Sequence, residues 1–80
     1  MSTDLKSKAH NADVTVWVGK AGIDSVEDEL ADQLQDREVV KVKFLRAARG
    51  GTSTEELADE LADRVNADLL ETRGNTAVYH

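Results

Sequence analysis

The sequence predicts one α/β domain over residues 1–80, with its elements in the order (α)βαβαββ. Residues 14–18 and 40–44 alternate in polarity with period two, which predicts strands. Segments 23–34 and 53–65 carry apolar residues at three- and four-residue spacing, which predicts amphipathic helices. The 80 residues include no cysteine and no proline, so a single core must hold the domain without disulfides.

Each of the two predicted strands has one apolar face. In residues 14–18, the three valines are expected on one face, with Thr15 and Trp17 on the other. In residues 40–44, the two valines and the phenylalanine are expected in the core, and both lysines on the opposite side.

The two predicted helices each follow a start signal. Asp24 or Ser25 is expected to act as the N-cap of the first helix. Ser53, with Glu56 three residues later, has the spacing of a capping box at the start of the second helix. The side chains expected in the core are Ile23, Val26, Leu30 and Leu34 from the first helix, and Leu57, Ala58, Leu61, Ala62 and Val65 from the second.

The two ends of the chain carry shorter elements. Gly74 and Asn75 separate residues 69–72 from residues 76–79, and both residues tolerate a positive φ, so they predict a β-hairpin. Residues 4–10 predict a short N-terminal helix, which needs to dock on the domain to be stable.

The charge of the chain is unevenly distributed. The net charge of −6 argues against nucleic acid as a partner, because phosphate binding rewards cations. Segments 24–38 and 55–71, however, each hold seven acids and one arginine, and so carry −6 each. Segment 39–54 contains two lysines, two arginines and no acid. The acidity belongs to two segments only, and it leaves a basic surface possible elsewhere.

A glycine loop, Gly19-Lys20-Ala21-Gly22, joins the first strand to the first helix. Such a loop can present backbone N–H groups to an anion, and Lys20 would add a mobile cation. The alternative is an ordinary βα turn, in which the glycines only supply unusual backbone angles, and the four residues alone favour this alternative. The loop matches neither a nucleotide P-loop nor a dinucleotide fingerprint.

Trp17 is the only tryptophan, and it lies on the strand face opposite the valines. It either packs under the N-terminal segment or offers a stacking surface to a base, and we favour packing. Alternating lysines such as Lys41 and Lys43 are usually a solvated face. Their nearness to Arg46 and Arg49 favours a binding role.

Aspartates recur at every fourth position in Asp24, Asp28, Asp32 and Asp36. We interpret them as a solvated helix face rather than a cation site, since like charges at this spacing repel one another at low salt. Concentrated salt screens that repulsion, so we hypothesise an acidic protein of halophilic origin.

Catalysis finds little support in the sequence. His10 and His80 lie near opposite ends, and neither a nucleophile–base–acid set nor a metal-ligand spacing is present. Tyr79 follows the alternation of the last strand and is interpreted as packing. We expect no enzyme activity, no cofactor, and no catalytic or metal site. With no signal peptide or long apolar run, we expect a cytoplasmic protein without a membrane segment.

Three segments resemble the CRM domain, named for chloroplast RNA splicing and ribosome maturation, and within it the single-domain YhbY-like proteins. Leu5-Lys6-Ser7-Lys8-Ala9-His10 resembles the end of the family's first helix, and residues 16–23 follow at the family's spacing. Residues 38–44 resemble its central strand, and residues 74–79 its closing strand. The resemblance covers nearly the whole chain.

The resemblance implies a mixed four-stranded sheet with packed helices, like the C-terminal domain of a bacterial translation initiation factor. It also implies RNA binding through the GxxG loop and association with pre-ribosomal particles, without enzymatic activity. Two departures stand out. Residues 1–12 correspond to a truncated form of the family's first helix, and acidic helices replace a surface that is usually basic.

Together, these observations predict a monomeric RNA-binding protein that acts on ribosomal RNA or its precursor. The expected RNA contacts are Gly19, Lys20, Ala21, Gly22, Trp17, Lys41, Lys43, Arg46, Arg49 and Arg73, with Lys6 and Lys8 from the N-terminal segment. One rival is a protein–protein adaptor that uses the acidic helices to bind basic ribosomal proteins. A second rival is a small-ligand regulatory domain, for which the sequence shows no apolar pocket.

Overall fold

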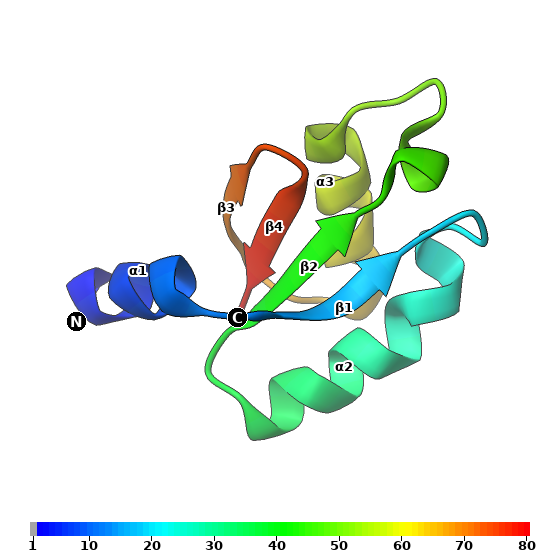
Figure 1. Ribbon diagram of the computed structural model, residues 1–80. Helices are drawn as coiled ribbons and strands as arrows, with labels where there is room; N and C mark the ends of the chain where they lie inside the picture. Colours follow the sequence, from blue (N-terminus) through cyan, green and yellow to red (C-terminus); the bar gives the residue numbers. More distant parts are fainter. Residues whose placement is uncertain (1) are drawn as a thin grey trace.

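The computed structural model describes residues 2–80, and the side chains of residues 7–80 (Figure 1). Its elements, in chain order, are α1 (Ser2–Asn11), β1 (Val14–Val18), the 3₁₀ turn η1 (Ile23–Val26), α2 (Glu27–Asp36), β2 (Val40–Phe44), the 3₁₀ turn η2 (Arg46–Arg49), α3 (Thr54–Val65), β3 (Leu69–Arg73) and β4 (Thr76–Tyr79). The predicted α/β domain and its order of elements are confirmed.

The four strands form one mixed sheet in the order β1-β2-β4-β3. β1 and β2 are parallel, as a strand–helix–strand unit requires, and β4 runs antiparallel to both β2 and β3. Figure 1 shows α2 and α3 against the same sheet, with β1 and β2 pointing in the same direction. The mixed four-stranded sheet that the resemblance implied is therefore present.

A single hydrophobic core lies between the sheet and helices α2 and α3. The strands contribute Val16, Val18, Val40, Val42, Phe44, Ala77 and Tyr79, and the helical segments contribute Ile23, Val26, Leu30, Ala58, Leu61 and Ala62. Leu34, Leu57 and Val65 pack at its edge. The core positions expected from the periodicity are confirmed. The Tyr79 hydroxyl donates a hydrogen bond of 2.8 Å to the Ala58 carbonyl, and this bond ties β4 to α3.

A β-bulge interrupts the alternation of β1. Val14 pairs with Lys41 and Val16 pairs with the next residue, Val42, so Thr15 is the extra residue in the ladder. The Thr15 hydroxyl donates to Gln33 of α2, and the Gln33 side chain donates to the Thr15 carbonyl at 3.3 Å. The expectation that all three valines share one face, with Thr15 on the other, is therefore wrong. Val14 shares a row with Lys41, because the bulge shifts the register by one residue.

The helix starts agree only in part with the sequence signals. The first helix begins with η1, and α2 starts at Glu27 without a side-chain cap, so neither Asp24 nor Ser25 is its N-cap. The Ser25 hydroxyl instead donates to the Gly22 carbonyl at 2.8 Å. In α3, the Ser53 side chain accepts the Glu56 N–H at 3.2 Å, which confirms this cap. The Glu56 carboxylate accepts from Thr52 at 2.8 Å, so the reciprocal half of the capping box is not formed.

The hairpin between β3 and β4 turns at the predicted pair. Gly74 has a φ of +58°, whereas Asn75 does not take a positive φ. The Asn75 carbonyl accepts the Phe44 N–H at 2.7 Å. The turn is therefore bonded to the end of β2, which holds it at one end of the sheet.

Helix α1 lies outside the main core and contacts β3. Ala9 and Val78 are both 1% exposed, yet neither belongs to the core cluster. Val78 lies between the core residues Ala77 and Tyr79, so it faces the other side of the sheet. Its burial indicates that α1 covers the β4–β3 part of that second face. The side chains of Leu5 and Lys6 lie outside the described residues.

Candidate nucleic-acid interface

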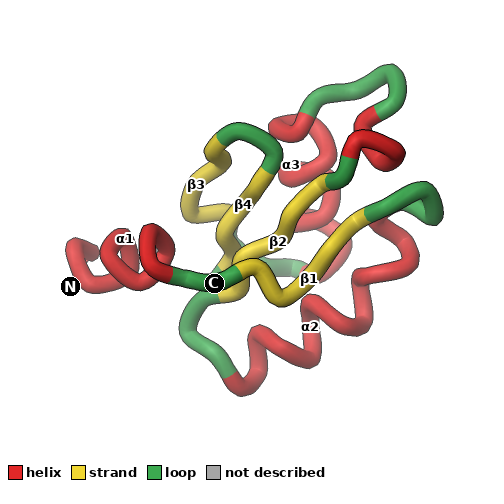
Figure 2. The backbone as a smooth tube through the Cα atoms, viewed as in Figure 1, coloured by secondary structure: helices red, strands yellow, loops and turns green. Residues whose placement is uncertain are grey.

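Three connections meet at one end of the sheet, which we call the loop end. They are the GxxG loop (residues 19–22), the η2 segment and the β3–β4 turn, and the first and last of these are green in Figure 2. The Leu45 N–H donates to the Val18 carbonyl at 2.8 Å, which brings the start of η2 beside the GxxG loop. Because β1 and β2 are parallel, their C-terminal ends lie at the same end of the sheet.

The GxxG loop is a tight turn that leaves its middle residues in solvent. The Gly22 N–H donates to the Gly19 carbonyl at 2.9 Å, and Lys20 and Ala21 between them are exposed. Gly22 has a φ of +84°, a conformation that side chains disfavour, so glycine is needed there. Among the described residues, no hydrogen bond uses the N–H groups of Lys20 and Ala21. Two backbone donors without a protein partner among the described residues and one mobile ammonium group therefore lie together on exposed residues.

The GxxG loop does not lead directly into an α-helix. The η1 turn separates it from Glu27, the first residue of α2. The sequence predicted that the loop would join a strand to a helix, and this is confirmed, with η1 as the 3₁₀ first turn of that helix. The donors that remain are those of the loop itself, because the start of α2 is one turn away.

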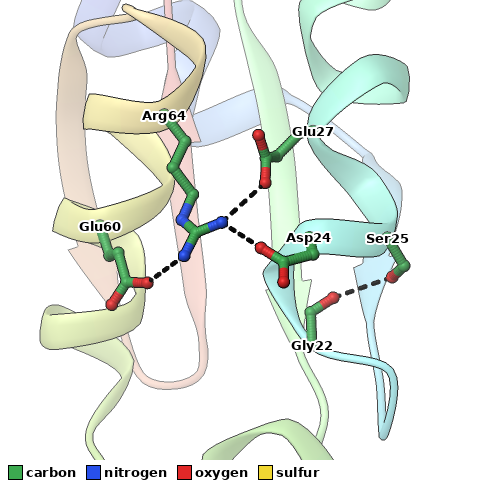
Figure 3. Close-up of polar contacts among 6 residues, drawn as sticks. All are labelled: Gly22, Asp24, Ser25, Glu27, Glu60 and Arg64. Atoms are coloured by element: carbon green, nitrogen blue, oxygen red, sulfur yellow. Dashed lines mark hydrogen bonds and ion pairs between the residues drawn. The ribbon is translucent and has the colours of Figure 1, made fainter.

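Arg64 of α3 forms ion pairs with acidic residues that lie behind the GxxG loop (Figure 3). Its guanidinium binds Asp24, contacts Glu27 at 2.9 Å and contacts Glu60 at 2.9 Å. Hydrogen bonds to Glu27 and then Glu60 raise the pKa of Arg64. Without a cation beside them, Asp24 and Glu27 would oppose an incoming phosphate. Their pairing with one cation reduces that repulsion and also links η1 and α2 to α3.

A row of register partners crosses the whole sheet next to the loop end. Trp17 of β1 pairs with Lys43 of β2, Lys43 pairs with Thr76 of β4, and Thr76 pairs with Arg73 of β3. Cross-strand partners project from the same face. Lys43 neighbours Val42 and Phe44 of the core, so this row faces away from the core. We call these four residues the cross-strand row.

Trp17 is 53% exposed, the highest value among the large hydrophobic side chains of the described residues. The expectation that it packs under the N-terminal segment is therefore wrong. Helix α1 lies against β3, at the opposite edge of the sheet from β1, and so it leaves Trp17 in solvent.

The remaining predicted cations take different places. Lys41 is half-buried, and its row contains Val14, Val78 and Glu71. Arg46 is exposed in η2 at the loop end. Among the described residues, no ion pair involves Lys20, Lys41, Lys43, Arg46 or Arg73.

Two of the predicted RNA-binding side chains, Arg49 and Lys8, contact other groups of the protein instead. Arg49 donates from Nε to the Phe44 carbonyl at 3.1 Å, so it holds the backbone where η2 leaves β2. Lys8 pairs with Glu38 at the opposite end of the sheet. An open hollow of about 390 Å³ lies there, lined by Lys8, Asn11, Asp13 and Arg37 among others. Lys8 is therefore not part of the loop end, and the Lys6 side chain lies outside the described residues.

Two participants were not identified from the sequence. Thr76 completes the cross-strand row, and its only sequence signal is its place after the hairpin turn. Arg64 pairs with Asp24 and Glu27, and these residues are 40 and 37 positions away in the chain. No local pattern predicts a pairing over that separation.

Two features of the described part of the chain bear on whether it could hold a metal ion or use Tyr79 in catalysis. No group of three or more histidine, cysteine, aspartate or glutamate side chains there could hold a metal ion. Burial raises the pKa of Tyr79 above its ordinary value, with a further contribution from the charge of Asp59. Tyr79 is fully buried, so its interpretation as packing is confirmed.

No helix of residues 2–80 is long and apolar enough to span a membrane.

Comparisons with known proteins agree with this architecture. The CRS1 / YhbY (CRM) domain family matches residues 2–80. Over 75 residues the chain is 36% identical to a Methanocaldococcus jannaschii protein named as a probable RNA-binding protein. That match covers 94% of this chain and 56% of the relative, so the chain spans little more than half of the relative's length.

A solved structure gives the same result for the fold. It is the solution structure of a hypothetical Staphylococcus aureus protein, described as a candidate RNA-binding protein. The two chains superpose with a TM-score of 0.78 at 29% identity, over 99% of this chain and 81% of the other. The family match extends over almost every residue, and the mixed sheet is shared with a solved relative. The chain therefore belongs to the CRS1 / YhbY (CRM) domain family.

Proposed function

We propose that this protein binds RNA through the loop end, and that its target is ribosomal RNA or its precursor in a pre-ribosomal particle. The observation that carries the proposal is the exposed middle of the GxxG loop, where the N–H groups of Lys20 and Ala21 have no protein partner among the described residues. Backbone N–H groups and lysine side chains are ordinary phosphate ligands in nucleic-acid complexes. The RNA-binding descriptions of the two relatives support the same partner.

Charge placement supports this proposal. Lys43, Arg46 and Arg73 lie at the loop end with Lys20, and their charges are not neutralised by ion pairs within the described residues. Arg64 pairs with the nearest acids and offsets part of their negative charge. RNA approaching the loop end therefore meets a local excess of positive charge, although the whole chain carries −6.

We infer a binding protein rather than an enzyme, acting as a monomer in the cytoplasm. The titratable groups at the loop end are lysines and arginines, which suit phosphate binding better than acid–base catalysis. Long-range attraction to phosphate weakens steeply with salt, so short contacts from the loop carry the affinity if the protein works in concentrated salt.

The decisive test is the double variant Lys20→Asp with Ala21→Asp, which reverses the charge of the loop and places a carboxylate beside its N–H groups. RNA isolated from ribosomal particles should no longer bind, while circular dichroism shows a folded domain. The matched control is Arg37→Asp with Asn11→Asp, which makes the same charge change on exposed residues at the other end of the sheet. This control should weaken binding only slightly.

One rival function has a specific observation in its favour. The solvent-facing sides of α2 and α3 carry exposed acids, among them Asp28, Asp32, Asp59 and Asp63. Such a surface suits a basic protein partner. If the loop variant binds ribosomal particles as well as the wild type does, and binding survives nuclease digestion, the adaptor role replaces the RNA-binding proposal.

A further inference from the structure

Trp17 is a large aromatic side chain that the fold leaves about half exposed to solvent. It is the only tryptophan in the chain, it lies on the edge strand β1, and 53% of it is exposed. An aromatic ring in the core would bury far more area and stabilise the fold more. About half of the residue's surface thus remains accessible to a ligand.

The neighbours of Trp17 indicate the charge of that ligand. Lys43 is the direct register partner of Trp17, and Arg73 lies at the far end of the same row. Neighbouring strands are about 4.8 Å apart, so the row is roughly 14 Å long. The next row on this face adds Lys41 and one acid, Glu71. Three cations against one carboxylate give the face a surplus of positive charge, which complements a phosphate backbone.

The same row adjoins the GxxG loop. Trp17 is two residues before Gly19, and β1 leads straight into the loop. Lys43 is likewise two residues before Leu45, whose N–H is bonded to Val18. A nucleic acid held at the loop end therefore has Trp17 within reach of its next nucleotides.

The combination of a ring and flanking cations selects one form of RNA. In a duplex, the faces of the bases are stacked on one another and cannot contact an outside ring. An unpaired nucleotide exposes its base for stacking on an aromatic side chain, while its phosphates contact lysine and arginine. The phosphates of a fully paired duplex would contact the cations, but none of its bases would stack on Trp17.

We propose that Trp17 is the stacking surface for the base of an unpaired nucleotide, with the flanking phosphates along Lys43 and Arg73 of the cross-strand row. The protein then prefers RNA that carries an unpaired residue next to the segment held by the GxxG loop. This inference rests on the proposed RNA-binding function and names the class of RNA that the site takes.

The test compares two RNA probes that differ at one position. The first is a short RNA duplex with every base paired, and the second is the same duplex with one unpaired adenosine. Binding is measured by the fluorescence anisotropy of a dye on the RNA. The wild type should bind the second probe more tightly, by roughly 5- to 150-fold, the range expected for one stacked base.

Because Trp17 is the sole tryptophan, its intrinsic fluorescence reports the contact directly. The unpaired adenosine should quench it, and the paired duplex should quench it much less. Trp17→Leu should remove the preference between the probes, whereas Trp17→Phe, which keeps an aromatic ring, should retain part of it. Val14→Ala is the control on the same strand and should leave the preference unchanged.

The outcomes separate this inference from the proposed function. If the two probes bind equally and Trp17→Leu changes nothing, while Lys20→Asp with Ala21→Asp abolishes binding, the stacking role is overturned and RNA binding through the loop stands. If the wild type binds neither probe nor ribosomal RNA, both are overturned. If Trp17→Leu weakens only nuclease-resistant binding to ribosomal particles, Trp17 contacts a protein and the stacking role is again overturned.

Discussion

The two faces of the sheet carry different strand residues and serve different purposes. The face under α2 and α3 buries its side chains almost completely, and the helices expose their acids on the far side. Near the loop end, where α1 does not reach, the second face leaves Trp17 and Arg73 exposed and Lys43 half-buried. The stabilising surface and the candidate binding surface are therefore separate, and net charge describes neither of them.

The largest expected effect comes from breaking the helix-covered face. Leu30→Ala removes a fully buried side chain of α2 and should lower the free energy of unfolding by about 2–5 kcal/mol. Trp17→Ala on the second face should cost about 1 kcal/mol or less, because half of that side chain is already in solvent. Urea denaturation of both variants measures the difference. Equal losses would mean that Trp17 is part of the core.

The next effect concerns the buried hydrogen bond between the Tyr79 side chain and the Ala58 carbonyl. Tyr79→Phe removes the 2.8 Å hydrogen bond to Ala58 and should cost about 0.5–1.5 kcal/mol at neutral pH. The pKa of Tyr79 is raised by burial, so this group's contribution is complete below pH about 10 and declines as the pH rises further. Denaturation at a series of alkaline pH values should therefore show a shallower decline in Tyr79→Phe than in the wild type.

A smaller effect should come from Arg64, the cation that links α2 to α3 behind the GxxG loop. Arg64→Gln leaves Asp24 and Glu27 uncompensated behind the GxxG loop, so affinity for RNA should fall a few fold in dilute buffer. The loss should shrink as salt is added, because both acids are at the surface. Arg64→Lys keeps the charge and should retain most of the affinity. RNA titrations at two salt concentrations provide the measurement, and a loss that does not depend on salt would contradict the electrostatic explanation.

The smallest effect tests the halophilic hypothesis on the acidic helix. Asp32 is exposed between Asp28 and Asp36 at four-residue spacing. Asp32→Asn removes two like-charge contacts and should stabilise the protein by about 0.2–0.5 kcal/mol for each contact at low salt. Unfolding followed against KCl should show this gain disappear as the wild type becomes more stable. A wild type that is equally stable in dilute buffer would count against a halophilic design.

Local patterns predicted most of the elements and the core. Period-two alternation identified β1 and β2, and the spacing of Leu30, Leu57 and Leu61 identified the two helices, because burial of one face imposes the periodicity. Patterns failed where a non-local bond decided the outcome. Thr15 bulges from β1, where it hydrogen-bonds to Gln33 of α2, and Asp24 contacts Arg64 of α3 instead of capping its own helix.

The sequence by itself determined the order of elements, the GxxG loop and the confinement of acid to two segments, since each depends on neighbouring residues. Only the tertiary structure decided that Trp17 is exposed and that Lys43, Thr76 and Arg73 align with it. Register across three strand pairs sets that row, and pairing between strands far apart in the chain follows from the packing of the whole domain. The same packing placed Lys8 at the opposite end and brought Arg64 behind the loop.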